Sequence, residues 1–117
     1  NINLKIAILG LAYKENTNSI KNSPSIELLN KIKSSSIKVY DPLVTRINIE
    51  GVIMTKSIDD AIKNSDILVI ATAWEEFRSL DLRLIKSQMN SNIIIDPYKI
   101  LNEESLKKLD FIYYSIG

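Results

Sequence analysis

The stretch Leu4–Pro24, LKIAILGLAYKENTNSIKNSP, decides the fold of this 117-residue chain. It opens with an apolar run, Leu4–Leu9, that predicts a buried strand, and it ends where a helix-like run begins at Pro24. Between them lies a turn at the place where doubly wound α/β domains hold a nucleotide phosphate. The turn has one glycine, Gly10, where a dinucleotide fingerprint needs three. The backbone therefore cannot approach a pyrophosphate closely, and we expect no complete dinucleotide site on this domain alone.

Beyond this stretch, short apolar runs alternate with stretches of helical period. The expected strands are Leu4–Leu9, Ile37–Tyr40, Val52–Met54 (at an edge), Ile67–Ala71, Ile93–Ile95 and Phe111–Ser115. The expected helices are Pro24–Ser34, Ser57–Asn64 with Ser57 as its cap, Leu80–Met89 and Asn102–Leu109. This order predicts one α/β domain over residues 1–117. We expect it to be three-layer and Rossmann-like, with a mostly parallel sheet of about five to six strands and helices on both faces.

The composition excludes several classes of function. With 15 basic and 14 acidic residues, the net charge of +1 gives no case for a nucleic-acid-binding stripe or a membrane-surface patch, so we expect neither partner. The chain has no Cys and no His, which excludes a thiolate nucleophile, an imidazole base and the usual zinc sites. The lack of cysteine is typical of a cytoplasmic protein. A receiver domain needs acids directly after its first strand, where this chain has Gly10–Ala12.

In open sheets of this kind, ligands bind outside the carboxyl ends of the strands. Lys14 and Lys21 follow the first strand and are either phosphate-binding charges or solvated lysines. Lys99 follows a later strand, and a convergence of the three would suit a nucleotide diphosphate. Asp41 ends the second strand, where an acid binds ribose in dinucleotide folds. Because the glycine fingerprint is missing, we expect a capping or turn role for Asp41.

Aromatic and acidic side chains follow another central strand in the segment ATAWEEF, residues 71–77. Trp74 and Phe77 either stack on a base or cover the strand ends, and we expect packing. Glu75 and Glu76 are possible acids or bases, but no partner stands at a defined spacing from them.

Taken together, these segments resemble the C-terminal domain of the UDP-glucose/GDP-mannose dehydrogenase family. The matching pieces are Gly10-Leu-Ala-Tyr-Lys14 with Thr17, Ser23-Pro24, Tyr40-Asp41-Pro42, Asp66 with LVIATAWEEF, and Ile95-Asp96. They keep the family's order over nearly the whole chain. The string Gly-x-Ala-aromatic-Lys…Thr…Ser-Pro is quite specific to the family.

The resemblance implies an NAD-dependent dehydrogenase that oxidises a UDP-sugar at C6 to the uronate in two steps. In that family an N-terminal domain binds NAD, a central helical region makes a homodimer, and the C-terminal domain closes over the nucleotide of the sugar substrate. The expected partners are therefore a UDP-sugar and the N-terminal and central domains of the same enzyme. The family's nucleophilic cysteine lies outside this chain, so we expect the isolated domain to be inactive.

Five residues take roles from the resemblance, position by position. Tyr13 stands at the family's aromatic residue and Lys14 at its substrate-contacting lysine. Lys21 stands where an arginine usually reaches the NAD of the other domain, and lysine keeps the charge without the bidentate fork. Tyr98 stands where an arginine usually contacts the nucleotide sugar. Lys99, beside it, is the candidate to supply that charge.

An alternative from another class is a non-catalytic Rossmann-like module used in regulation or assembly. The departures from the family pattern favour it, because Asn18 and Ser19 replace an acidic pair and Tyr98 replaces an arginine. A Gly-rich βαβ unit and a cysteine upstream of Asn1 would favour the enzyme instead.

Overall fold

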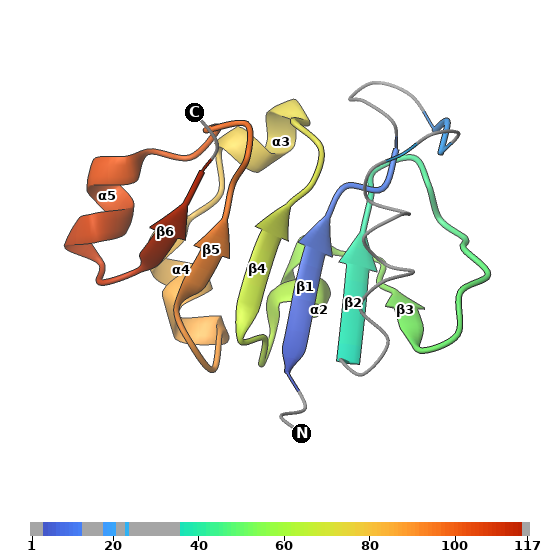
Figure 1. Cartoon of the computed structure of the whole chain (residues 1–117), viewed down its shortest axis with the longest axis horizontal. Helices are drawn as coiled ribbons and strands as arrows, with labels where there is room; N and C mark the ends of the chain where they lie inside the picture. Colours follow the sequence, from blue (N-terminus) through green and yellow to red (C-terminus); the bar gives the residue numbers. More distant parts are fainter. Residues whose placement is uncertain (1–3, 13–17, 21–22, 24–35, 116–117) are drawn as a thin grey trace.

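The computed structural model describes residues 4–12, 18–20, 23 and 36–115. Within these ranges a six-stranded sheet has the order β3-β2-β1-β4-β5-β6, with every neighbouring pair parallel. The strands are β1 (Lys5–Leu9), β2 (Ser36–Tyr40), β3 (Val52–Met54), β4 (Ile67–Ile70), β5 (Ile93–Ile95) and β6 (Ile112–Tyr114). The arrows in Figure 1 accordingly all point the same way. The predicted α/β class is confirmed, and β3 lies at an edge as expected.

The described helices are α2 (Ile58–Ile62), α3 (Glu75–Arg78), α4 (Leu82–Gln88) and α5 (Glu103–Lys108). The predicted cap of α2 is confirmed, because the Ser57 hydroxyl accepts from the backbone N–H of Asp60 at 3.1 Å. Asn102 caps α5 in the same way. The helix expected over Pro24–Ser34 lies outside the described residues.

Two details of the helices differ from expectation. The helix expected from Leu80 begins at Leu82, because the carboxylate of Asp81 accepts the N–H groups of Arg83 and Leu84 and so caps it. The short helix α3 was not predicted. Its cap residue is Trp74, which makes no side-chain cap hydrogen bond, so the usual start signal is absent.

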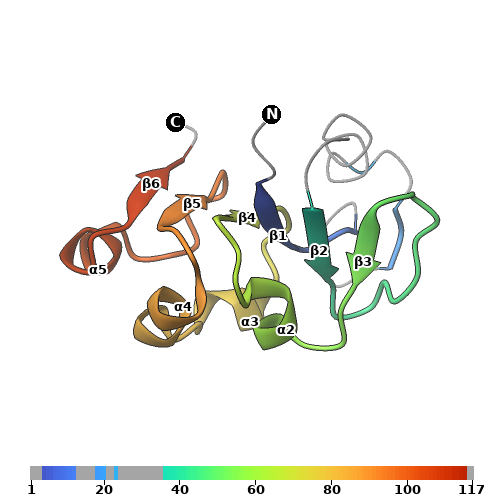
Figure 2. The ribbon, with the colours of Figure 1, turned by 90° about the horizontal axis from the view of Figure 1, so that it is seen from below.

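Side chains alternate across the sheet and divide the core into two clusters. On β1, Ala7 and Leu9 belong to the cluster under the helices, while Ile6 and Ile8 belong to the cluster on the other face. Figure 2 shows α2, α3 and α4 together on one side of the sheet. That side also holds buried Phe77, Ile85 and Leu106 from the helical segments. The opposite cluster includes buried Val44 from the loop after β2.

The chain leaves β1 towards β2 and later leaves β4 towards β5, although β1 and β4 are neighbours. The strand order therefore reverses between these two strands. In open α/β sheets this reversal marks where ligands bind, outside the carboxyl ends of the strands.

Candidate functional site at the carboxyl edge of the sheet

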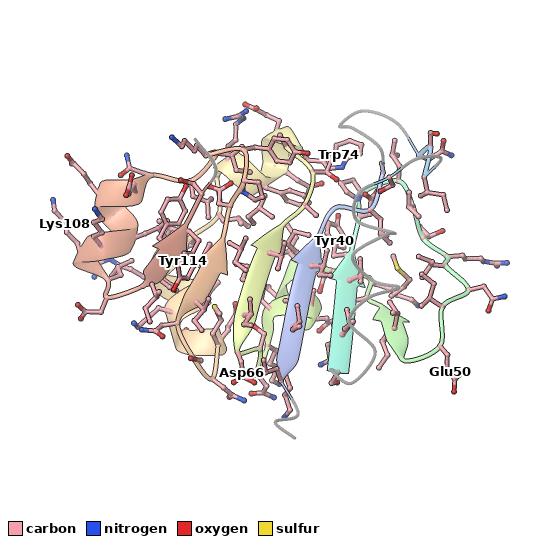
Figure 3. The ribbon with its side chains drawn as sticks, in the orientation of Figure 1. Tyr40, Glu50, Asp66, Trp74, Lys108 and Tyr114 are labelled. Carbon is pink, nitrogen blue, oxygen red and sulfur yellow. The ribbon has the colours of Figure 1, made fainter. Side chains whose placement is uncertain are left out.

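The segments that follow β1, β2, β4 and β5 meet at one edge of the sheet because the strands are parallel. In Figure 3, Trp74 lies at this edge, which is the upper one in that view, and Asp66 lies at the opposite edge. The carboxylate of Asp66 there accepts the backbone N–H of Lys5 at 3.0 Å. Asp66 therefore pairs with the start of β1 and lies away from the candidate site.

Gly10 brings the turn after β1 against the turn after β4. Its φ is +102°, and a Cβ atom on it would lie 2.5 Å from both Cβ and Oγ1 of Thr72. Thr72 in turn donates from Oγ1 to the carbonyl of Ala12 at 3.2 Å. Because a Cβ contact below about 3 Å is not tolerated, the glycine is required here for packing between the two turns.

Asp41 holds the turns after β1 and β2 together. Its Oδ2 accepts the N–H groups of Leu11 at 2.6 Å and Ala12 at 3.1 Å, and its Oδ1 accepts those of Leu43 and Val44, both at 2.8 Å. The side chain is only 3% exposed. The predicted turn role is confirmed, because both oxygens are occupied and a ribose could reach neither.

The hydrogen bonds of this turn also decide whether it could bind the pyrophosphate of NAD, the cofactor that a Rossmann-like fold would imply. In a dinucleotide fold the amides of the first turn face the pyrophosphate. Here the amides of Leu11 and Ala12 donate to Asp41, and the carbonyl of Leu11 accepts from the Ser23 hydroxyl at 2.7 Å. The described part of this turn therefore does not fit a dinucleotide.

The aromatic residues of the segment after β4 are packing residues, as predicted. Trp74 is 8% exposed and Phe77 is fully buried. The Phe77 ring meets Tyr40 edge-on, with centroids 6.4 Å apart and an interplanar angle of 67°. The indole Nε1 of Trp74 is buried without a hydrogen-bond partner.

Glu76 has a partner that its sequence position did not reveal. Burial raises the pKa of Tyr40, and the charges of Glu76 and Asp41 and a hydrogen bond to Glu76 raise it further. Tyr40 ends β2 and Glu76 lies in α3, so 36 positions separate the two in sequence. The phenol therefore stays protonated at neutral pH.

A second buried carboxylate, Asp96, shapes the turn after β5. It has no exposed surface and accepts the N–H groups of Ile100 and Leu101 at 3.2 and 2.9 Å. It also accepts the phenol of Tyr113 at 2.8 Å. Burial, followed by that hydrogen bond and the charges of Asp96 and Glu103, raises the pKa of Tyr113 well above its usual range.

The Asp96 turn presents the two described residues predicted to contact substrate. Tyr98 is 52% exposed, and Lys99 is exposed with a φ of +53°. The backbone N–H of Lys99 donates to the carbonyl of Asp96 at 3.2 Å. Both side chains lie at the carboxyl edge, where the sequence places them.

The other predicted contact residues, Tyr13, Lys14 and Lys21, lie outside the described residues. The convergence of Lys14, Lys21 and Lys99 thus stays a prediction. In the part of the chain that the structure covers, no three Asp and Glu side chains gather as a metal site would require. None of the helices described above is long and apolar enough to cross a membrane.

Residues 7–103 match the model of the UDP-glucose/GDP-mannose dehydrogenase family, UDP binding domain. The chain is 40% identical over 119 residues to the UDP-glucose 6-dehydrogenase of Rickettsia conorii, covering 96% of this chain and 28% of that protein. It is 29% identical over 118 residues to UDP-glucose 6-dehydrogenase TuaD of Bacillus subtilis, covering 96% and 26%. The chain thus spans about a quarter of the length of these relatives.

The solved structures give the same result. The UDP-D-ManNAc dehydrogenase of Pyrococcus horikoshii superposes with a TM-score of 0.77 at 32% identity, covering 98% of this chain and 26% of that one. A UDP-glucose dehydrogenase of Pyrobaculum islandicum, at 20% identity and a TM-score of 0.66, shares the fold. The family match includes the turn after β1, the Asp41 turn, the segment after β4 and the Asp96 turn. The chain therefore belongs to the UDP-glucose/GDP-mannose dehydrogenase family, as its UDP-binding domain.

Proposed function

We propose that this domain binds the nucleotide of a UDP-sugar within an NAD-dependent UDP-sugar 6-dehydrogenase. The substrate would be UDP-glucose or a UDP-N-acetylhexosamine, oxidised at C6 to the uronate. The family match over residues 7–103 carries the proposal, because it includes all four strand-end segments of the carboxyl edge. Similar proteins are named for UDP-glucose and for UDP-ManNAc, which supports a UDP-sugar and leaves the sugar open.

In this proposal Tyr13, Lys14, Tyr98 and Lys99 contact the substrate. Lysine side chains suit the role because they carry flexible point charges that pair with phosphate. The exposure of Tyr98 and Lys99 at the carboxyl edge supports their part in it. Asp96 acts indirectly, because its hydrogen bonds to Ile100 and Leu101 position the turn that carries them.

Lys21 would reach towards NAD held mainly by another domain of the same enzyme. The amides of Leu11 and Ala12 support a cofactor site on another domain, because both donate to Asp41 and are not available to a pyrophosphate. With no cysteine in the chain, the covalent step of the family's reaction would also belong elsewhere. The isolated domain should therefore bind without turning over, and the intact enzyme should be a homodimer.

Titration of the chain with UDP, followed by calorimetry and by amide NMR shifts, tests the binding role. We expect saturable binding, weaker than in the full dehydrogenase, with shifts at the carboxyl edge. In the full dehydrogenase, Lys14→Ala should lower kcat/KM for the UDP-sugar by about tenfold or more, because a charge-assisted contact is lost. Exposed Lys56→Ala, between β3 and α2, is the matched control and should leave kcat/KM unchanged.

Two results would count against this function. One is a Lys14→Ala enzyme with the affinity and turnover of the parent. The other is a chain that shows no UDP-dependent shift and a parent protein without dehydrogenase activity, which would favour the non-catalytic module.

A further inference from the structure

A pocket of about 160 Å³ lies at the edge of the sheet opposite the candidate site, between the starts of β1 and β2 and the end of α2. The polar residues that line it are Lys5, Ser36, Lys38, Lys63, Asn64 and Ser65. Asp66, which Figure 3 shows at this edge, follows Ser65 directly in sequence. This pocket shares no lining residue with the carboxyl edge.

The sheet register explains why three of these side chains meet. Lys5 pairs with Ser36, and Ala7 pairs with Lys38, in the parallel ladder of β1 and β2. Because side chains alternate, Lys5, Ser36 and Lys38 project to the same face as Ala7, which is the face under the helices. Lys38 thus stands on an internal strand at a half-buried, helix-facing position where apolar residues are the rule.

Within the described part of the chain, the charges of the lysines in this pocket are not balanced by ion pairs. No acidic side chain among the described residues forms an ion pair with Lys5, Lys38 or Lys63. The neighbouring Asp66 uses its Oδ2 for the backbone N–H of Lys5. Three lysines line this pocket, so their positive charges repel one another, and a bound anion would offset that repulsion.

Ser65 also lines this pocket, and its hydroxyl is unpaired. The residue is 2% exposed, and its Oγ is buried without a hydrogen-bond partner. Its backbone is fully engaged, because its N–H donates to Ile62 and its carbonyl accepts from Asn90 and Ser91. An unpaired buried hydroxyl is costly, and an acceptor in the pocket would satisfy it.

We propose that this pocket binds a small oxyanion, namely phosphate or the phosphoryl group of a small phosphomonoester. The ammonium groups of Lys5, Lys38 and Lys63 would neutralise its charge, and the Ser65 hydroxyl would donate to one oxygen. The volume suits one phosphoryl group and is too small for a nucleotide. The site is separate from the proposed UDP-sugar site, and its existence does not depend on that function.

Amide NMR titration of the chain with inorganic phosphate, at an ionic strength held constant with sodium chloride, tests the proposal. We expect saturable shifts at Lys5, Lys38, Asn64 and Ser65, and none at Gly10–Ala12. A parallel titration with glycerol 3-phosphate distinguishes the two sources, because tighter binding than phosphate identifies a phosphomonoester. Shifts that chloride reproduces equally well would overturn the proposal.

Two variants and one control sharpen the test. Lys38→Gln should weaken phosphate binding about tenfold, and Ser65→Ala should weaken it several-fold without changing the charge. Lys108→Gln, on α5 at the far end of the sheet, should bind as the parent does. A native-like spectrum confirms the fold of each variant. Equal affinities in Lys38→Gln, Ser65→Ala and Lys108→Gln would refute the site.

Discussion

Two buried carboxylates, Asp41 and Asp96, organise the turns of the carboxyl edge through hydrogen bonds to the chain itself. Asp41 accepts four backbone N–H groups, and Asp96 accepts two together with the phenol of Tyr113. Neither is available to a ligand. Their effect on binding is therefore indirect, because they fix the backbone next to the residues proposed to touch the nucleotide.

Replacing Asp41 by Asn should lower the free energy of unfolding by about 2–4 kcal/mol, because the amide NH₂ would face two N–H donors in a buried place. Asp81→Asn is the matched control. Asp81 accepts both of its N–H groups through Oδ1 alone, and Asn caps helices as well as Asp does, so its cost should stay within a few tenths of a kcal/mol. Urea unfolding of both variants measures the difference. Equal losses would contradict the role given to the second oxygen of Asp41.

Substitutions at two glycines with positive φ distinguish the energetic cost of crowding from the cost of backbone strain. Gly10→Ala should cost about 3 kcal/mol, since a Cβ there would lie 2.5 Å from Thr72 in addition to the unfavourable φ. Gly51→Ala, with a φ of +83° and nothing within 4 Å, should cost about 1 kcal/mol from φ alone. Thermal and urea unfolding give both values. A Gly10 variant no worse than the Gly51 variant would show that the two turns can separate.

At the scale of single residues, the sequence predicted the turn role of Asp41 but not its hydrogen-bond partners. The turn role of Asp41 followed from the missing glycine fingerprint. Its contacts with Leu11 and Ala12 span about 30 positions and depend on β1 and β2 being neighbours, which no local spacing encodes. The influence of Glu76 on Tyr40 was missed because it too depends on the packing of segments far apart in sequence.

At the scale of elements, the strands were predictable and one helix was not. Buried parallel strands read as continuous apolar runs, and β4 and β5 consist entirely of such residues. The helix α3 is four residues long and begins without a side-chain cap, so neither period nor start signal marks it. Its position depends on the packing of Phe77 under the sheet, which is a tertiary effect.

Tyr113 joins β6 to the turn after β5, and its raised pKa makes that junction sensitive to alkali. The unfolded chain loses the Tyr113 proton near the usual value of 10.0, whereas the folded chain keeps it. The stability from this group is therefore complete below pH 10 and is lost as the pH rises further. The difference in unfolding free energy between the parent and Tyr113→Phe should shrink above pH 10. A difference that stays constant from pH 8 to pH 11 would contradict this linkage.

For the whole molecule, stability should fall from the middle of the sheet to its edges. The central strands β1 and β4 are almost entirely buried, whereas the edge strands β3 and β6 contain exposed Ile53 and Ile112. Hydrogen exchange should therefore be slowest in β1 and β4 and fastest in β3 and β6. Exchange measured by NMR or mass spectrometry at pH 7 checks this order. Uniform protection across the six strands would instead indicate that the sheet opens only as a unit.

The hydrogen bonds of Asp41 also constrain how such a domain could acquire a dinucleotide site. A glycine at position 12, the second of a fingerprint that starts at Gly10, would still donate its amide to the carboxylate, so it would gain no pyrophosphate while residue 41 stayed Asp. Losing the carboxylate first would leave four backbone donors unpaired. A turn that binds pyrophosphate here would therefore need the loss of the carboxylate and new partners for these amides at the same time.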